Sequence, residues 1–467
     1  MKAQLRCLFL LPAILFGVFQ TKATTIFPIA TNANFVEMAG NIASSGSNYL
    51  VGIAQNQTVP FVQLLSSNGA LVESPVNLGS SEGSPLVAFG KTNYLAFWAG
   101  DEYVQAQLIS ASGTAVGSVF NLPASDGSAE TTLAFDGTNY LIVWEDEGSI
   151  DPGIGAFYGQ LVTPAGALSG SPFLIGSTLA GPESNSHAGL VFGATNYLFA
   201  WQETNSVSGG WNAYGTFVSR NGSVSSPFQI SQISSLDYDP PSAAFDGTNF
   251  FVVMNIDTNR TSGGGPVWNI YGRLVSQSGT FPGSEVLLNT NQSTITALAF
   301  DGANYLLTWG NNTYSTNTDR NSSFQFYNRS GSAIGPVFTP FQAQGTNTPL
   351  FSGLVFDGSK FAVGTIFGSL IVGADGSIEG LASGLIYGTF IPASTTAPTL
   401  TASNLAGTQF PLQLTGTPGI DYAIQISTNL ALSNWTTVIT NTPTNGIFSF
   451  TDASATNESR FYRAVFQ

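Results

Sequence analysis

The stretch FDGTNYLIVW, residues 135–144, is one of seven related hairpin-like segments in this chain of 467 residues. FDGTNFFVVM (245–254) and FDGANYLLTW (300–309) repeat it most closely. Aligned on their central aromatic residue, the copies are marked by Tyr49, Tyr94, Tyr140, Tyr197, Phe250, Tyr305 and Phe361. Successive copies are 45 to 57 residues apart. A period of this length predicts a propeller or another repeat array.

Each repeat also contains a second signature, which follows a loop of variable length. It reads YGQLVTPAG from Tyr158, YGTFVSRNG from Tyr214 and YGRLVSQSG from Tyr271, and looser versions include VQAQLISASG (104–113), FQFYNRSG (324–331) and SLIVGADG (369–376). A short apolar segment such as FLIG (173–176) then precedes the next hairpin. Four strands per repeat make a propeller blade, and continuous apolar runs such as YLIVW indicate sheets that are buried on both faces. The sequence therefore predicts an all-β fold with a seven-bladed β-propeller over residues 24–392.

Two segments fit the remaining place in the seventh blade. TIFPIATNAN (25–34) resembles the fourth strand of a repeat but precedes the first hairpin, so it is free to complete the last blade. LIYGTFIP (385–392) competes for this place because it resembles a third-strand signature. Closure of the ring removes exposed sheet edges. The pattern leaves open which of the two segments closes it.

Both ends of the chain differ from the repeats. Lys2 and Arg6 precede an apolar run from Cys7 to Phe19 and a small residue, Ala23, which together predict a secretory signal over residues 1–23. The run is shorter than the roughly 20 apolar residues of a membrane-spanning helix. After Pro392, ASTTAP (393–398) is typical of a linker, and strand-like runs over 399–467 predict a small β-sandwich.

The repeats resemble a family of secreted bacterial β-propeller repeat proteins with FDGTNYLxVW and YGxxV motifs. The resemblance spans about residues 26–392 and implies a propeller and an extracellular setting, without implying one activity. YAIQISTNL (422–430), FSFTD (448–452) and RFYRA (460–464) resemble fibronectin type III or immunoglobulin-like modules of large secreted bacterial proteins. Such modules imply a spacer or attachment role.

Composition excludes several classes of function. Removal of residues 1–23 takes away three of the 12 basic residues and none of the 27 acidic ones, which leaves a net charge of −18. A protein of this charge repels nucleic acids and anionic membranes. The single cysteine, Cys7, leaves with the signal, so neither a disulfide nor a thiol nucleophile is expected. The single histidine, His187, rules out an HExxH site.

Recurring aspartates in the FDG turns have two interpretations. They are Asp136, Asp246, Asp301 and Asp357. Aspartate followed by glycine favours a tight turn in which the carboxylate accepts local backbone N–H groups. Calcium remains possible, but an EF-hand-type loop needs several oxygen ligands within one short stretch. We therefore expect no cofactor or structural metal, with calcium as the alternative.

The loops after the conserved tryptophan vary in length and should lie on one face of the ring, opposite the uniform DGTN turns. Variable loops on a rigid scaffold favour a binding site on that face. The longest are 145–157, 202–213, 255–270 and 310–323. The candidate ligand-binding residues in them are Glu145, Asp146, Glu147, Asp151, Glu203, Trp211, Asp257, Trp268 and Tyr314. No catalytic residue is assigned.

Carboxylates beside aromatic rings suit a glycan, and they also suit a glycosidase if two acids stand at the required separation. The sequence favours a secreted, non-catalytic propeller that binds an extracellular glycan or protein, with the C-terminal module as a spacer or attachment unit. One alternative is a polysaccharide hydrolase or lyase that uses loop carboxylates. The other is a structural or adhesion component of the cell surface.

Overall fold

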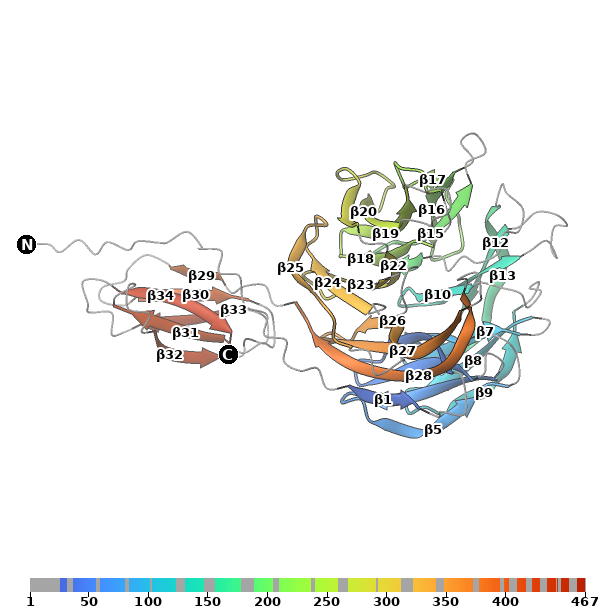
Figure 1. Ribbon diagram of the computed structural model, residues 1–467, viewed down its shortest axis with the longest axis horizontal. Helices are drawn as coiled ribbons and strands as arrows, with labels where there is room; N and C mark the ends of the chain where they lie inside the picture. Colours follow the sequence, from blue (N-terminus) through green and yellow to red (C-terminus); the bar gives the residue numbers. More distant parts are fainter. Residues whose placement is uncertain are drawn as a thin grey trace, which may run out of the picture. The chain divides into compact units, whose positions relative to one another are not determined.

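The computed structural model is built from β-strands, and the residues that it describes contain no helix (Figure 1). They fall into two compact units, one ending at Pro392 and one beginning at Ala393. The described residues are 26–31, 37–55, 59–79, 84–100, 103–122, 131–146, 156–177, 189–204, 210–236, 240–258, 268–290, 293–311, 322–341, 348–372, 378–394, 399–402, 410–416, 422–428, 435–441, 443, 447–452 and 460–466.

The first unit contains seven antiparallel sheets of four strands, which we call blades 1 to 7. Their strands are, for blade 1, β2 (Glu37–Ser44), β3 (Asn48–Gln55), β4 (Val59–Ser66) and β5 (Leu71–Asn77); for blade 2, β6 (Leu86–Gly90), β7 (Asn93–Ala99), β8 (Val104–Ser110) and β9 (Ala115–Asn121); for blade 3, β10 (Thr131–Phe135), β11 (Tyr140–Asp146), β12 (Ala156–Val162) and β13 (Leu168–Ser177); and for blade 4, β14 (Gly189–Phe192), β15 (Asn196–Thr204), β16 (Trp211–Ser219) and β17 (Phe228–Gln229). The remaining strands are, for blade 5, β18 (Ser242–Phe245), β19 (Asn249–Asp257), β20 (Trp268–Ser276) and β21 (Val286–Asn289); for blade 6, β22 (Ser293–Phe300), β23 (Tyr305–Asn311), β24 (Ser322–Tyr327) and β25 (Ala333–Phe338); and for blade 7, β26 (Thr348–Phe356), β27 (Lys360–Val372), β28 (Ile378–Pro392) and β1 (Phe27–Ala30).

The blades form a closed ring. The first strand of each blade contacts the first strand of the next, and β26 of blade 7 contacts β2 of blade 1 (Figure 1). The predicted seven-bladed propeller is therefore confirmed. Both faces of a blade are covered by its neighbours, which is why every residue of β11 is buried. This explains the continuous apolar runs of the second strands, which an exposed sheet face would interrupt with polar residues.

Both candidate segments take part in closing the ring. β28, which contains residues 385–392, is the third strand of blade 7, and β1 pairs with it as the fourth. The interpretation of SLIVGADG (369–376) as a third-strand signature is wrong, because residues 369–372 continue the second strand, β27. β27 and β28 pair from Lys360–Pro392 as far as Val372–Ile378. This hairpin is much longer than those of the other blades, so its strands extend beyond the repeat that the sequence aligned.

The FDG turns have the predicted chemistry. In blade 3, Asp136 Oδ1 accepts hydrogen bonds from the backbone N–H groups of Thr138 and Asn139, each at 2.6 Å. Gly137 has a φ of 87°, which favours glycine. Equivalent bonds are accepted by Asp246, Asp301 and Asp357. The carboxylate therefore holds the turn that joins the first strand to the second.

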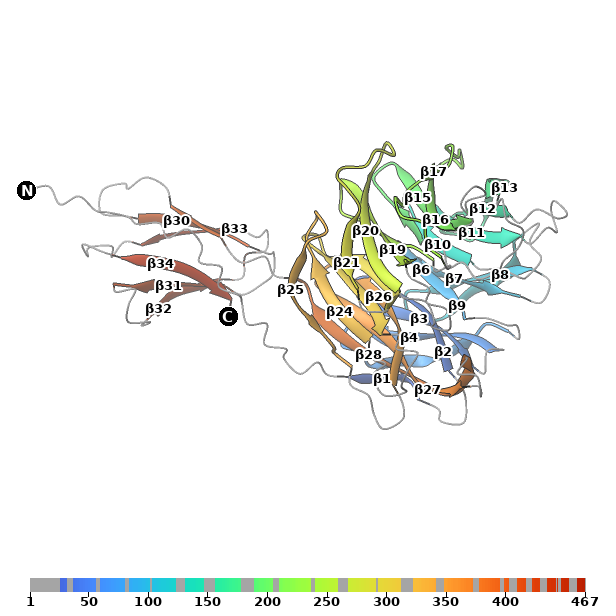
Figure 2. The same ribbon diagram turned by 45° about the horizontal axis from the view of Figure 1, so that its top comes forward.

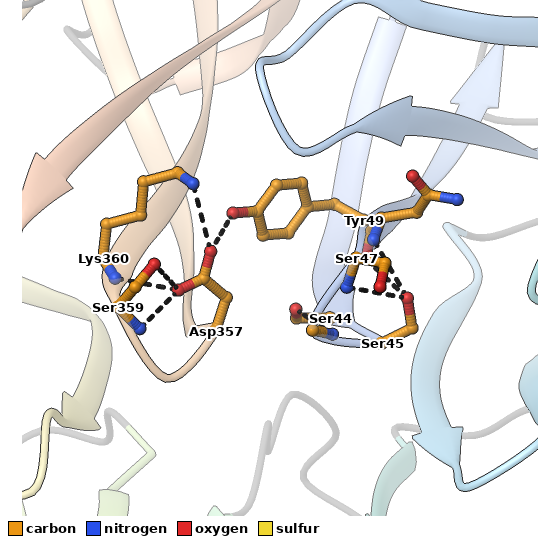
Figure 3. A network of polar contacts seen from close by, with 9 residues as sticks. Ser44, Ser45, Ser47, Tyr49, Asp357, Ser359 and Lys360 are labelled. Carbon is orange, nitrogen blue, oxygen red and sulfur yellow. Dashed lines mark hydrogen bonds and ion pairs between the residues drawn. The ribbon is translucent and has the colours of Figure 1, made fainter. Parts of the chain in front are cut away.

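The tyrosine that follows each turn connects neighbouring blades. The Tyr94 hydroxyl of blade 2 donates to the main-chain oxygen of Asn48 in blade 1, at 2.9 Å. Tyr140 and Tyr197 make the same contact with the preceding blade. At the seam of the ring, Tyr49 of blade 1 donates instead to the Asp357 carboxylate of blade 7 (Figure 3). The repeat thus encodes contacts between blades as well as hairpins within them.

A buried glutamine of the third strand holds the fourth strand in place. In blade 2, Gln107 Nε2 donates to the main-chain oxygens of Leu108, at 3.1 Å, and Val116, at 2.8 Å. It lies at a β-bulge between β8 and β9. The residues that occupy this position in blades 1, 3 and 6 and bond a fourth-strand carbonyl are Gln63, Gln160 and Gln325. The amide satisfies carbonyl groups that the bulge removes from the ladder.

The second unit is a small β-sandwich, as predicted. One sheet has the order β29 (Thr399–Ala402), β30 (Phe410–Thr415), β33 (Ile447–Asp452), and the other has the order β32 (Thr436–Asn441), β31 (Tyr422–Ser427), β34 (Phe461–Phe466). Figure 2 shows the two layers. Between them lies a core that includes Leu412, Tyr422 and Ile424.

Candidate ligand-binding face

The two ends of the ring are built differently. Because the strands alternate in direction, all connections between the first and second strands and between the third and fourth strands lie at one end, which we call the turn face. The connections between the second and third strands and between consecutive blades lie at the other end, the loop face. Pro392 pairs with Lys360 at the turn face, so the chain leaves the propeller there.

The sequence-predicted acids lie at strand ends on the loop face. Glu145 and Asp146 end β11 and pair with Phe157 and Ala156 of β12. In blade 4, Glu203 pairs with Asn212, and in blade 5, Asp257 pairs with Trp268. The predicted loops 145–157, 202–213 and 255–270 are thus too long, because backbone pairing continues past the conserved apolar run on both strands. Glu147, Asp151 and Tyr314 lie outside the described residues, as do His187 and most of the connections at this face.

These acids are buried, although a solvated loop would expose them. Asp146 and Asp257 have no exposed surface, and Glu145 and Glu203 are 5% and 7% exposed. Trp268 is also buried, whereas Trp211 is half-buried. Burial of a carboxylate is costly without hydrogen-bond or charge partners, so these side chains are held in defined surroundings at the base of the loops.

Glu145 and Glu203 face the same space between blades 3 and 4. Val143 and Trp201 pack together in one apolar cluster, and each acid follows one of them by two residues on the same strand. Since side chains alternate along a strand, both acids project toward this junction. Trp201 Nε1 donates to Glu203 Oε2 at 3.3 Å. The junction therefore combines two carboxylates with aromatic rings.

Phe157 of blade 3 extends the aromatic surface of this junction. Its ring centroid is 5.0 Å from that of Phe199 and 6.0 Å from that of Trp201, both in blade 4. Tyr214, the cross-strand partner of Trp201, stacks on it with the ring centroids 6.1 Å apart. The aromatic rings fix the position of the strand ends from which Glu145 and Glu203 project.

A serine-rich segment brings Trp211 and Asp257 together. Ser235 and Trp211 exchange two main-chain hydrogen bonds, at 2.7 and 2.8 Å. The Asp257 N–H donates to Ser235 Oγ at 2.8 Å, and the N–H of Leu236 donates to the Asp257 main-chain oxygen at 2.9 Å. Sequence reasoning missed Ser235, which is buried, because it lies in a connection between blades. The sequence signal is the serine-rich run SQISS (231–235), which follows the short β17.

Asn212 is a second residue that the sequence did not indicate. It is 1% exposed, and its Oδ1 accepts a hydrogen bond from Ser234 Oγ at 2.9 Å. Its partner across the strands is Glu203. Trp211, Asn212 and Ser235 therefore form a mostly buried polar and aromatic cluster at the base of the blade 4 loop.

The same segment is joined to blade 5 nearer its outer edge. Gln232 donates its N–H to Glu285 Oε2 at 2.8 Å, and the Glu285 N–H donates back to Gln232 Oε1 at 3.4 Å. Burial raises the pKa of Glu285, although the bond from Gln232 and the charge of Arg273 oppose this shift. Arg273 occupies the third-strand position that glutamine takes in four other blades, and it donates to the Ile230 main-chain oxygen. Blades 4 and 5 are thus held together where β17 is short.

The described part of the chain contains no group of three or more His, Cys, Asp or Glu side chains arranged to share a metal ion. Within the same residues, no helix is long and apolar enough to span a bilayer.

The chain matches no protein-family model and no curated protein sequence. Among solved structures, it is similar to an α-L-arabinofuranosidase, Arb93A, of Fusarium graminearum (8% identity, 79% of this chain and 97% of that one, TM-score 0.42). It is also similar to an acylaminoacyl peptidase of Pyrococcus horikoshii (8%, 82% and 58%, 0.43), so the chain spans little more than half of that enzyme. A third is the β-propeller domain of the Trilobed protease of Pyrococcus furiosus (8%, 73% and 91%, 0.43). At these identities, the similarity concerns the fold alone.

Proposed function

We propose that the protein is a secreted, non-catalytic binding protein that holds an extracellular ligand on the loop face of its propeller. The observation that carries this proposal is the difference between the two ends of the ring. The turn face repeats one short turn, whose buried aspartates Asp136 and Asp246 accept hydrogen bonds from the backbone of their own turn. At the loop face, the strand ends of blades 3, 4 and 5 bury four carboxylates at positions that are not shared by all repeats. Only 8% of the residues in this chain are charged. Buried charges require compensation, so four of them at the base of loops of unequal length favour a functional site.

A glycan is the ligand class that these residues suit best. Half-buried Trp211 supplies a ring on which the C–H face of a sugar can pack, and its main-chain hydrogen bonds with the buried Ser235 hold it in place. Pockets of this kind combine aromatic surface with a few fixed polar groups. An extracellular protein is the alternative ligand. The chain leaves the propeller at the turn face, which supports a spacer or attachment role for the C-terminal module.

A polysaccharide hydrolase is a second candidate because Glu145 and Glu203 face one junction. Glycoside hydrolases use two carboxyl groups about 5 to 10 Å apart, one of them with a raised pKa. The hydrolase function requires that one of these two acids donate a proton to the leaving group.

A combined binding and cleavage screen separates these functions. The protein without residues 1–23 is tested on a glycan array and for release of reducing ends from polysaccharides. We expect binding without cleavage, and a loss of at least tenfold in affinity for W211A but not for W211F. Release of reducing ends that disappears in E145Q and in E203Q would establish the hydrolase instead.

The control for these amide variants is E73Q, which changes an exposed glutamate of β5 outside the proposed site. Thermal unfolding of every variant shows whether a loss of binding reflects a loss of folding. Binding that survives W211A and E203Q but is lost on substitution of Lys91 or Arg220, both exposed on the turn face, would reject the loop face as the site.

A further inference from the structure

The second unit contains an arginine, Arg463, whose position is fixed and which pairs with no carboxylate of the residues that the structure describes. Arg463 Nε donates to Gln425 Oε1 at 2.8 Å, and its guanidinium carbon lies 4.3 Å from the centroid of the Trp435 ring. Among the described residues, it makes no ion pair, and its two Nη groups donate no hydrogen bond. By contrast, Arg460 forms an ion pair with Asp452, in which Nε lies 3.0 Å from Oδ2. Arg463 therefore presents its terminal Nη edge without a protein acceptor.

The surroundings of Arg463 form a polar row across three strands. Gln425 of the central strand β31 pairs with Arg463 of β34 on one side and with Thr437 of β32 on the other. Gln425 Nε2 donates to Thr437 Oγ1 at 3.1 Å, and Thr437 is exposed. Ile424, the neighbour of Gln425 on β31, belongs to the core between the sheets. Because side chains alternate, the row lies on the outer face of this sheet, and it is about 10 Å wide.

The charge of this unit differs from that of the propeller. Residues 393–467 contain two basic and three acidic residues. One of the acidic residues, Asp452, forms an ion pair with Arg460. The second unit by itself therefore carries a net charge of only −1. An anion can approach Arg463 without strong local repulsion.

We propose that Arg463, Gln425, Thr437 and Trp435 form a second binding site, which takes the carboxylate of an acidic polysaccharide. The planar guanidinium holds a carboxylate through two parallel N–H···O bonds, a geometry that lysine does not provide. Gln425 and Trp435 hold the guanidinium group in position before a ligand binds, which lowers the entropic cost of binding. The exposed hydroxyl of Thr437 is placed for a neighbouring sugar hydroxyl.

The partial burial of Arg463 supports this site. Burial lowers the pKa of its guanidinium, which remains charged because arginine titrates far above neutral pH. A partly desolvated charge interacts more strongly with a bound anion than a fully hydrated one. This inference does not rest on the loop-face proposal, because the two sites belong to different units and different residues.

Affinity electrophoresis and calorimetry of the chain without residues 1–23 test the site, with oligogalacturonate as the probe and a neutral glucan oligosaccharide for comparison. We expect oligogalacturonate to bind and the glucan not to bind. R463Q should lower the affinity at least tenfold. R463K should lower it severalfold, because lysine keeps the charge but lacks the two parallel N–H groups of the guanidinium. The matched control is R220Q, since Arg220 also stacks on an aromatic ring, at 4.7 Å from Phe192, in the propeller.

Three outcomes would overturn the proposal. They are absence of oligogalacturonate binding by the unmodified chain, retention of binding in R463Q, and an equal loss in R220Q, which would indicate a general charge effect. If R463Q fails to fold, R463K and T437V decide the question, because R463K keeps the positive charge and T437V changes only an exposed hydroxyl. W211A, the loop-face variant, should leave oligogalacturonate binding unchanged, so failure of one proposal is distinguishable from failure of the other.

Discussion

Tyr49 of blade 1 donates a hydrogen bond to the carboxylate of Asp357 in blade 7, although the two residues are 308 positions apart in the chain (Figure 3). The same carboxylate holds its own turn through Ser359 and Lys360. Lys360 Nζ lies 3.3 Å from Asp357 Oδ2 and 4.7 Å from the centroid of Phe390. The first and last blades therefore meet at a charged contact, whereas the tyrosines of blades 2, 3 and 4 bond a neutral main-chain oxygen.

This seam should make the stability of the protein sensitive to acid. Burial opposes ionisation of Asp357, but the hydrogen bonds from Tyr49, Lys360 and Ser359 outweigh it and lower the pKa of Asp357 from 3.8 to about 2. A lowered pKa stabilises the folded state above the unfolded pKa, and this stabilisation is lost as pH falls toward the folded value. D357N should cost on the order of 1–2 kcal/mol at neutral pH. The difference from the unmodified protein should shrink between pH 4 and pH 2.

Chemical denaturation at a series of pH values measures this difference. The control is Y140F, which removes a tyrosine contact between blades 2 and 3 that involves no carboxylate. Its effect should be independent of pH over the same range. A D357N difference that stays constant down to pH 2 would show that the seam carboxylate does not carry the acid sensitivity.

Phe250 marks one of the two blade junctions at which the tyrosine hydroxyl is missing, and Phe361 marks the other. In blade 2, Gly90 leaves room for the Tyr140 hydroxyl, which donates to the main-chain oxygen of Asn93 at 2.7 Å. Gly193 leaves the same room beside the tip of the Phe250 ring, and a Cβ there would lie 2.5 Å from it. F250Y should therefore gain a hydrogen bond and stabilise the fold by about 1 kcal/mol. A lower unfolding midpoint for F250Y than for the unmodified protein would contradict this expectation.

The hairpins and the number of blades were predictable because their chemistry is local. The FDG turn depends on residues within four positions of Asp136, so its pattern survives in the sequence wherever the turn occurs. The architecture of blade 7 was only partly predictable, because SLIVGADG (369–376) has the residues of a third strand and only its long-range pairing shows otherwise. The two closing segments could not be ranked, since a period along the chain does not distinguish the third strand from the fourth.

The candidate site was predictable only in part for a similar reason. Glu145 and Glu203 carry charges that are typical of loops, and the sequence cannot show that backbone pairing continues through both residues. Their shared junction depends on the packing of Val143 against Trp201 from another blade. Ser235 was missed because it bonds Trp211 and Asp257 only when the short β17 leaves the connection free to do so.

Glu73 occupies a backbone conformation that favours glycine. Its φ is 60°, and the equivalent bulge positions of blades 2, 3 and 6 are occupied by Gly117, Gly170 and Gly335, with φ values of 71°, 76° and 68°. A non-glycine residue in this left-handed region costs about 1 kcal/mol. E73G should stabilise the protein by about that amount. E73A, which removes the charge but keeps a Cβ, should not, and equal gains for both variants would assign the effect to charge instead of backbone strain.

Gln107 should contribute more to stability than its neighbour Gln105, although both lie on β8. Gln107 is 4% exposed and donates to the main-chain oxygens of Leu108 and Val116 at the bulge. Gln105 makes an exposed hydrogen bond to the Asn121 side chain at 3.2 Å. Replacement of Gln107 by alanine leaves buried carbonyl groups without a donor, at a cost of about 1–3 kcal/mol, whereas Q105A should change the free energy of unfolding by less than about 0.5 kcal/mol. Urea denaturation of the two variants decides whether the glutamine holds the fourth strand, because equal destabilisation would mean that the bulge needs no side-chain donor.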